Sequence, residues 1–296
     1  MSQIQSGILQ DIPLLARYLT FTLENIDTAP AALAELRDIV DTQDTVVGFG
    51  VSLVDALGGN IPGIRAFPAW SGSGMDIPAT QSSLWCWLRG SDRGELLHRS
   101  RHIEKALAEA FSLESSTDAF RYGTGLDLTG YEDGTENPVD DDAVDAAIVN
   151  STDEGMNGSS FVAVQQWLHN MDGFEDMTTT EQDHTIGRRI TDNEEIDDAP
   201  DSAHVKRTAQ EDFDPEAFVV RRSMPWMDDE YAGLVFVAFG KSFDAFEALL
   251  NRMLGKDDGI VDALFSFTTP ITGSYFWCPP ANDGRMDLTA LGLQEG

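Results

Sequence analysis

The chain has little positive charge. Only four of its 296 residues are lysines (Lys105, Lys206, Lys241 and Lys256), and 51 acidic residues face 19 basic ones, so the formal net charge is −32. A surface of this sign repels the phosphates of nucleic acids and the head groups of anionic lipids. We therefore expect neither nucleic acid nor a membrane among its partners.

Long apolar runs are also missing. No stretch of 18 or more apolar residues occurs, so the sequence has no candidate transmembrane helix. The start, MSQIQSGILQDIP, has neither the basic region nor the continuous apolar segment of a secretory signal. These absences predict a soluble protein of the cytoplasm.

Cysteine is scarce, with Cys86 and Cys278 as the two examples. Both lie in aromatic runs, Trp85-Cys86-Trp87 and Phe276-Trp277-Cys278, which is typical of reduced thiols in a core. An unexported chain lives in a reducing compartment, so we expect no disulfide. No spacing resembles that of a zinc or iron–sulfur site.

What is present is a repeated pattern of strand-like and helix-like segments, with 42% hydrophobic residues to fill a core. In the first half we predict strands over 14–23, 45–53 and 83–88, helices over 31–40 and 93–111, and a loop over 115–138. In the second half we predict strands over 160–168, 218–221, 233–239 and 263–267, and helices over 178–187 and 243–254. The pattern predicts one α+β domain, 1–296, made of two ferredoxin-like halves, about 1–150 and 151–296, whose antiparallel sheets pack together.

Three polar groups stand out from this scaffold. His204 follows the very acidic region 172–201, whose composition is typical of a solvated loop. The cluster Arg221-Arg222-Ser223 ends an apolar run, and Asp133 lies between glycines in Gly130-Tyr131-Glu132-Asp133-Gly134. An imidazole for iron, a cation that stabilises an anion and a carboxylate that relays a proton are the functional groups of a haem peroxidase.

A series of short motifs carries a resemblance along nearly the whole chain. In their order and spacing they resemble the dye-decolorising peroxidases, in particular the compact B-type class. The matching segments are Gln5-Ser6-Gly7-Ile8-Leu9, Val47-Gly48-Phe49-Gly50, Pro62-Gly63-Ile64-Arg65, Pro78-Ala79-Thr80-Gln81, Trp87-Leu88-Arg89-Gly90-Ser91-Asp92-Arg93-Gly94, the GxxDG motif ending at Gly134, Ile186-Gly187-Arg188, Ser202-Ala203-His204 and Arg221-Arg222-Ser223-Met224-Pro225.

The resemblance implies an α+β barrel-like fold and a haem b cofactor whose iron is bound by His204. It places Asp262 behind the imidazole as the acceptor for its other ring nitrogen, and Arg188 against a haem propionate. From the residues alone, Asp262 also suits a turn or the start of a strand, and Arg188 also suits the surface.

On the other face of the haem, the resemblance makes Asp133 the proton shuttle and Arg221 the cation that stabilises charge on the peroxide. Ser223 lies on the same side of the strand as Arg221 and becomes a distal hydrogen-bonding group, while Arg222 points the other way. The Asp-Gly pair at Asp133 is otherwise a common turn sequence.

The implied activity is reduction of hydrogen peroxide with one-electron oxidation of organic donors such as dyes and phenolics, in a homo-oligomer. Two alternatives are a haem-handling protein without peroxidase turnover and a chlorite-dismutase-like enzyme, and the Asp133 and Arg221 motifs count against both. Nothing in the sequence supports an encapsulating shell partner, and the tail 287–296 is too generic to be a docking peptide.

The other histidines are weaker candidates for functional residues. His98 and His102 share one face of a predicted helix, but no neighbouring HExxH-type motif supports a metal site there. His169 and His184 suit the surface or loops near the haem. Among aromatic residues that could relay electrons, the sequence does not choose between Trp167, Trp226, Trp277 and Tyr131.

The charge excess leads to a first prediction. Repulsion among so many carboxylates is tolerable mainly where salt screens it, so we interpret the composition as adaptation to salt, the alternative being a merely very soluble protein. Raising the salt concentration from dilute buffer to about 1 M, where the Debye length falls to about 3 Å, should increase the free energy of unfolding measured with urea. Full stability in dilute buffer would contradict the interpretation.

Overall fold

The structure is a computed structural model that describes residues 4–72 and 74–293. The first three residues of the start and the last three of the tail 287–296 lie outside the described residues. Within those ranges, no helix is long and apolar enough to cross a membrane. Cys86 and Cys278 are buried free thiols, as predicted.

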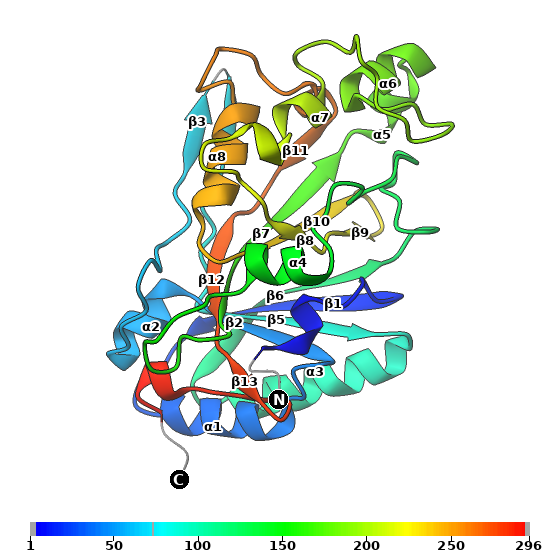
Figure 1. Ribbon diagram of the computed structural model, residues 1–296. Coiled ribbons are helices and arrows are strands. Elements are labelled where there is room, and N and C mark those ends of the chain that lie inside the picture. The colour runs from blue at the N-terminus through cyan, green and yellow to red at the C-terminus, as the bar shows by residue number, and fades with distance from the viewer. Residues whose placement is uncertain (1–3, 73, 294–296) are drawn as a thin grey trace.

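The first half contains four antiparallel strands in the spatial order β2-β5-β1-β6. Apolar side chains of α1 and α3, including Leu33, Leu36 and Ile103, pack on the outer face of this sheet. Figure 1 shows these two helices side by side below the sheet. The elements are β1 (Leu15–Leu23), α1 (Ala29–Ile39), β2 (Thr45–Phe49), β5 (Leu84–Gly90), α3 (Arg93–Leu107) and β6 (Phe111–Phe120).

The second half repeats the arrangement, with strands in the order β9-β10-β7-β12. Two short strands, β8 (Val220–Arg221) and β11 (Thr268–Pro270), pair with β10 and β7. The predicted α+β fold of two ferredoxin-like halves is thus confirmed, while their boundary near residue 150 stays a prediction. The main elements here are β7 (Ser160–His169), β9 (Met224–Met227), β10 (Ala232–Gly240), α8 (Asp244–Met253) and β12 (Ser274–Cys278).

The two sheets join into a closed barrel. One residue pair, Trp277 with Phe49, links β12 to β2, and another, Ala119 with Trp226, links β6 to β9. The inner faces of the strands form one of two large hydrophobic clusters, rich in aromatic rings such as Tyr18, which stacks between Trp85 and Trp87 at 6.2 Å from each. The barrel interior is therefore a packed core rather than a channel.

The connection from β7 to β9 differs from its counterpart in the first half, where α1 packs on the sheet. It contains three short helices, which lie at the top of Figure 1 with α7 next to α8. These are α5 (Met171–Glu175), α6 (Thr179–Ile186) and α7 (His204–Arg207). Because no long helix fills this connection, space is left between α8 and the sheet.

The remaining elements are peripheral. They are α2 (Val51–Leu57), β3 (Trp70–Gly72), β4 (Met75–Ile77), α4 (Asp140–Ala147), β13 (Ala281–Asn282), β14 (Arg285–Met286) and the 3-10 turns Ser6–Ile8, Gln210–Asp212, Ala263–Ser266 and Thr289–Leu291.

Several predicted elements differ from the observed ones in their ends or in their type. The strand over 45–53 stops at Phe49, because Gly50 is the N-cap residue of helix α2. A Cβ on Gly50 would lie 2.2 Å from the Ser82 carbonyl oxygen, so glycine suits this close approach. The start of the predicted loop, 115–120, is part of β6, a polar strand that pairs along β1. The predicted strand 263–267 is a 3-10 turn capped by the Asp262 side chain. In the acidic region 172–201 the predicted helix over 178–187 is confirmed as α6, whereas the short helix α5, capped by Asn170, was not predicted.

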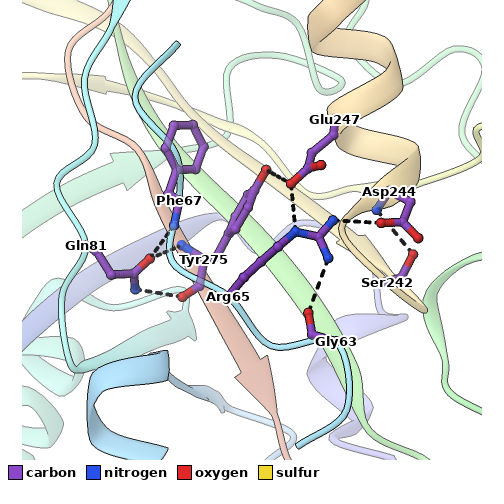
Figure 2. A network of polar contacts seen from close by, with 8 residues as sticks. All are labelled: Gly63, Arg65, Phe67, Gln81, Ser242, Asp244, Glu247 and Tyr275. Carbon is purple, nitrogen blue, oxygen red and sulfur yellow. Dashed lines mark hydrogen bonds and ion pairs between the residues drawn. The ribbon is translucent and has the colours of Figure 1, made fainter. Parts of the chain in front are cut away.

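A polar network fixes α8 to the rest of the fold (Figure 2). Arg65 donates from Nη2 to Asp244 (2.7 Å) and from Nε to Glu247 (2.9 Å). The hydroxyl of the buried Tyr275 also donates to Glu247 Oε1 (3.2 Å). Gln81 in turn holds the backbone of Tyr275 through both its amide N–H and its carbonyl. The motif residues Arg65 and Gln81 therefore position α8, which lines the cavity described below.

The two carboxylates of α8 in this network differ in their exposure to solvent: Asp244 is mostly exposed and Glu247 is mostly buried. Glu247→Ala should lower the free energy of unfolding by about 2 kcal/mol, because it leaves a buried hydroxyl and a guanidinium N–H without an acceptor. Asp244→Ala should cost only about 0.5 kcal/mol, because that carboxylate is 78% exposed. Urea unfolding of the two variants measures the difference, and equal losses would show that Tyr275 and Glu247 do not act together.

Candidate active site

An apolar cavity lies between the second sheet and α8. Its empty space, including the part that is open to solvent, is about 980 Å³. Leu234 and Phe236 of β10 line one wall, and Leu249 and Met253 of α8 line the other. The cavity thus offers two apolar walls to a ligand.

His204, the first residue of α7, lines this cavity. Its Nδ1 lies 2.7 Å from Oδ2 of Asp262, whose side chain is completely buried. The other oxygen, Oδ1, accepts a hydrogen bond from the Leu264 amide (2.8 Å). An ionised carboxylate only accepts, so Nδ1 carries the hydrogen. Nε2, which bonds to none of the described residues, then keeps its lone pair for a metal.

Several contacts hold this histidine in place. Arg207 in the same short helix makes a two-armed ion pair with Asp258 (2.8 and 2.9 Å) and donates to the carbonyl of Arg252 at the end of α8 (2.8 Å). The Ala263 amide donates to the Ser202 carbonyl (2.8 Å), which ties the segment of His204 to that of Asp262. Sequence reasoning did not identify Arg207, although its partner Asp258 follows shortly after the end of α8.

Arg221 faces the cavity from the sheet side, on β8. Its backbone is clamped by the side chain of Asn137, which accepts from the Arg221 amide (2.8 Å) and donates to the Arg221 carbonyl (3.0 Å). The guanidinium Nε is buried and has no protein partner. A cation held in this way is ready to bind an anionic or polar ligand.

Asp133 lies next to Arg221 on the cavity lining. Gly130 and Gly134 flank it with φ values of +89° and +80°, a backbone conformation that favours glycine, so the motif forms a tight loop. Burial raises the pKa of the Asp133 carboxyl, an effect that the positive charge of Arg221 partly offsets. Asp133 is therefore poised between its protonated and ionised forms at a higher pH than an exposed aspartate.

Asp133 and Arg221 also line a second, polar cavity of about 750 Å³, partly open to solvent. Ser223 lines this second cavity and accepts a hydrogen bond from the Val237 amide (3.3 Å), but it does not line the main cavity. Arg222 points away from the main cavity, as predicted, and donates to the carbonyls of Ile8 and Leu9.

Arg188 is buried but engaged elsewhere. Its guanidinium donates to Glu136 (2.6 Å), to the Asn193 carbonyl (2.9 Å) and to Glu195 (3.4 Å), and it does not line the main cavity. Its contact with a propionate therefore stays a prediction.

The sequence missed a second histidine–carboxylate pair on the cavity wall. His169 is not a surface residue: its Nε2 lies 3.0 Å from Asp127 Oδ2, and its Nδ1 lies 2.6 Å from the Thr268 hydroxyl. His169 and Thr129 together lower the pKa of Asp127 despite its burial. The only signal available was that His169 ends a strand whose alternate residues, 165 and 167, also face the cavity.

Polar groups without a protein partner show what the cavity can accept. The fully buried Gln165 lines the cavity, and neither its amide nitrogen nor its amide oxygen has a hydrogen-bond partner among the described residues. Trp167 Nε1 and Arg221 Nε, which belong to two other lining residues, also have no partner there. A ligand with apolar faces and a few polar contacts would satisfy these groups. A flat, largely apolar metal cofactor coordinated by His204 Nε2 fits this lining.

Comparisons with known proteins agree with this geometry. The family model described as Dyp-type peroxidase, C-terminal, matches residues 124–283. A Dye-decolorizing peroxidase from Mycobacterium tuberculosis is 31% identical over 252 residues, covering 82% of this chain and 75% of the relative. Another from Rhodococcus erythropolis is 30% identical over 245 residues, covering 80% and 72%.

Solved structures give the same result over the whole fold. A Dyp-type peroxidase protein from Shewanella oneidensis covers 100% of both chains with a TM-score of 0.89 and 27% identity. DyPB from Rhodococcus jostii covers 93% of this chain and 95% of its own, with a TM-score of 0.84 and 27% identity. A variant of DyPB has been solved in complex with heme.

A barrel of two ferredoxin-like sheets, with a carboxylate-backed histidine and an aspartate–arginine pair on one cavity, defines an enzyme of the peroxidase class. The chain belongs to the dye-decolorising peroxidase family.

Proposed function

We propose that the main cavity binds haem b, whose iron His204 would hold, and that the enzyme reduces hydrogen peroxide at the expense of organic donors, which it oxidises in one-electron steps. The observation that carries this proposal is the pairing of His204 with Asp262, which leaves Nε2 free on a cavity that Asp133 and Arg221 also line. Bound haem would supply the iron redox chemistry for cleaving the peroxide O–O bond.

The residues of the chain would prepare and assist this chemistry. Asp262 keeps the proton on Nδ1 of His204 and makes the imidazole a stronger electron donor. On the sheet side, Asp133 takes a proton from one peroxide oxygen and returns it to the other, directly or through water. The Arg221 guanidinium stabilises the negative charge that develops between these two events.

Ser223 and Arg188 have supporting roles in the proposal. The Ser223 hydroxyl lies in the polar cavity that Asp133 shares, so it suits a hydrogen-bonding group along the approach of peroxide. Arg188 would contact a propionate by exchanging its partner Glu136, whose side chain is 62% exposed and free to turn to solvent.

A haem-handling protein without turnover would need His204 but neither Asp133 nor a buried arginine with an unpaired N–H, so this alternative is not favoured. We further propose that the enzyme acts in the cytoplasm as a homo-oligomer, with hydrogen peroxide and an organic electron donor as its small-molecule partners.

Removing the axial ligand tests the haem site. His204→Ala should lose the Soret absorption after reconstitution with haem, while His184→Ala, a nearby histidine that does not line the cavity, should keep it. Retention of a normal Soret band by His204→Ala would show that another residue binds the iron.

The rate at which peroxide changes the haem spectrum tests the distal residues. Arg221→Leu should slow it by about 100-fold or more, as the loss of a preorganised charge predicts.

Asp133 must be ionised to accept a proton, so the rate should fall on the acid side of the pH profile. Because burial raises the pKa of Asp133, this acid limb should lie above the usual aspartate pKa of about 3.9.

Asp133→Asn should abolish that limb and slow the reaction at all pH values. Asp145→Asn, which removes one exposed charge from α4, is the control and should behave as the wild type. Stopped-flow absorption measures both effects, and a normal rate in Asp133→Asn would remove Asp133 from the mechanism.

A further inference from the structure

Tyr131 connects the main cavity to a carboxylate near the surface. Its side chain is 5% exposed and lines the cavity, two residues before Asp133. Its ring packs edge-on against Phe174, with 6.2 Å between centroids, in a small cluster with Phe267. The phenol ring is therefore held rigidly against the space where the cofactor is proposed to bind.

The hydroxyl of Tyr131 has a dedicated proton acceptor. It donates to Oδ1 of Asp183 in α6 at 2.5 Å, a short bond typical of an O–H on a carboxylate. The same oxygen accepts the Ile190 amide (3.0 Å), which fixes its position. Asp183 itself is half-buried, so one side of the pair reaches solvent.

We propose that Tyr131 is a redox-active residue that relays single electrons from aromatic donors at the surface to the oxidised cofactor, with Asp183 as its proton acceptor. The inference rests on the proposed haem site. It assigns a second place of donor oxidation, for molecules too large to enter the cavity.

The electron and proton balance is complete within the pair. The oxidant is the enzyme after its reaction with peroxide, which takes one electron from the phenol ring. The O–H bond breaks and its proton moves along the existing hydrogen bond to the Asp183 carboxylate, leaving a neutral phenoxyl radical. Burial and the nearby carboxylate raise the pKa of Tyr131, so the phenol keeps its proton until the electron is removed. A phenolic or anilinic donor then returns one electron, and Asp183 returns the proton.

Other aromatic residues lack one part of this arrangement. Trp167 lines the cavity, but its buried Nε1–H has no acceptor. Tyr275 donates to Glu247 at 3.2 Å and packs edge-on against the cavity residue Phe246, but it does not line the cavity itself. Among residues 4–72 and 74–293, Tyr131 is the tyrosine that both lines the main cavity and donates to a carboxylate.

The outer end of the pair suits an apolar aromatic donor. The amide of Ile190 donates to Asp183, and the residue is 40% exposed. Its side chain lies next to Gly130, the residue before Tyr131. An exposed isoleucine beside a proton-accepting carboxylate offers both apolar contact and an acceptor for the donor's own O–H or N–H group.

The test compares Tyr131→Phe with Tyr275→Phe in the haem-loaded enzyme. Both changes remove one phenol that donates to a carboxylate and keep the ring, so they are matched in size and packing. After one equivalent of peroxide, freeze-quench electron paramagnetic resonance with ring-deuterated tyrosine detects a tyrosyl radical. A nitroso spin trap followed by peptide mass spectrometry locates it, and the steady-state oxidation of a bulky neutral phenol gives the rate.

We expect the wild type and Tyr275→Phe to show a tyrosyl radical trapped at residue 131. Tyr131→Phe should lose that signal and oxidise the bulky phenol at least tenfold more slowly, while peroxide still changes its Soret band at the normal rate. Asp183→Asn, which keeps an acceptor oxygen but no base, should weaken the radical signal.

Two results would overturn the inference. If Tyr131→Phe kept both the tyrosyl signal and the normal rate of oxidation of the bulky phenol, the relay would lie elsewhere, while the proposed function would remain intact. A wild-type Soret band that does not respond to peroxide would instead defeat the proposed function, and the inference with it.

Discussion

The hydrogen bond between Nδ1 of His204 and the buried carboxylate of Asp262 is the contact on which the rest of the site depends. A buried carboxylate is costly unless it is paired, and here the imidazole and the Leu264 amide share its two oxygens. The bond also joins two chain segments, because His204 precedes the last crossover and Asp262 follows α8. Arg207, through Asp258 and the end of α8, keeps these segments from separating.

The fold makes room for this contact by treating its two halves differently. Both halves have the same strand order, but the first covers its sheet with α1 and α3, whereas the second has α8 and three short helices. The cavity occupies the space between α8 and the sheet. The network of Arg65, Glu247 and Tyr275 ties α8 to the rest of the fold (Figure 2).

The sequence predicted the fold class and three residues that do share the cavity, because glycines and an apolar strand single them out. Ser223 lines the second cavity and Arg188 donates to Glu136, so their predicted roles toward a cofactor stay predictions. The place of His169 on the cavity wall and the contributions of Asp127, Asn137 and Gln165 were not predicted, since they come from pairings across 42 or more residues or from the face of a buried strand. The polar strand β6 was missed because its partner β1, not its own composition, makes it a strand.

The carboxylates around the cavity show how environment assigns roles to one chemical group. Asp262 is buried behind an imidazole, and Asp127 is held ionised by His169 and Thr129. Asp133 has one cation nearby and a raised pKa, while Asp183 reaches solvent and accepts from a phenol. Two of these groups are structural partners and two are suited to exchange protons. Such a division explains why a very acidic protein can still reserve a particular carboxylate for each proton transfer.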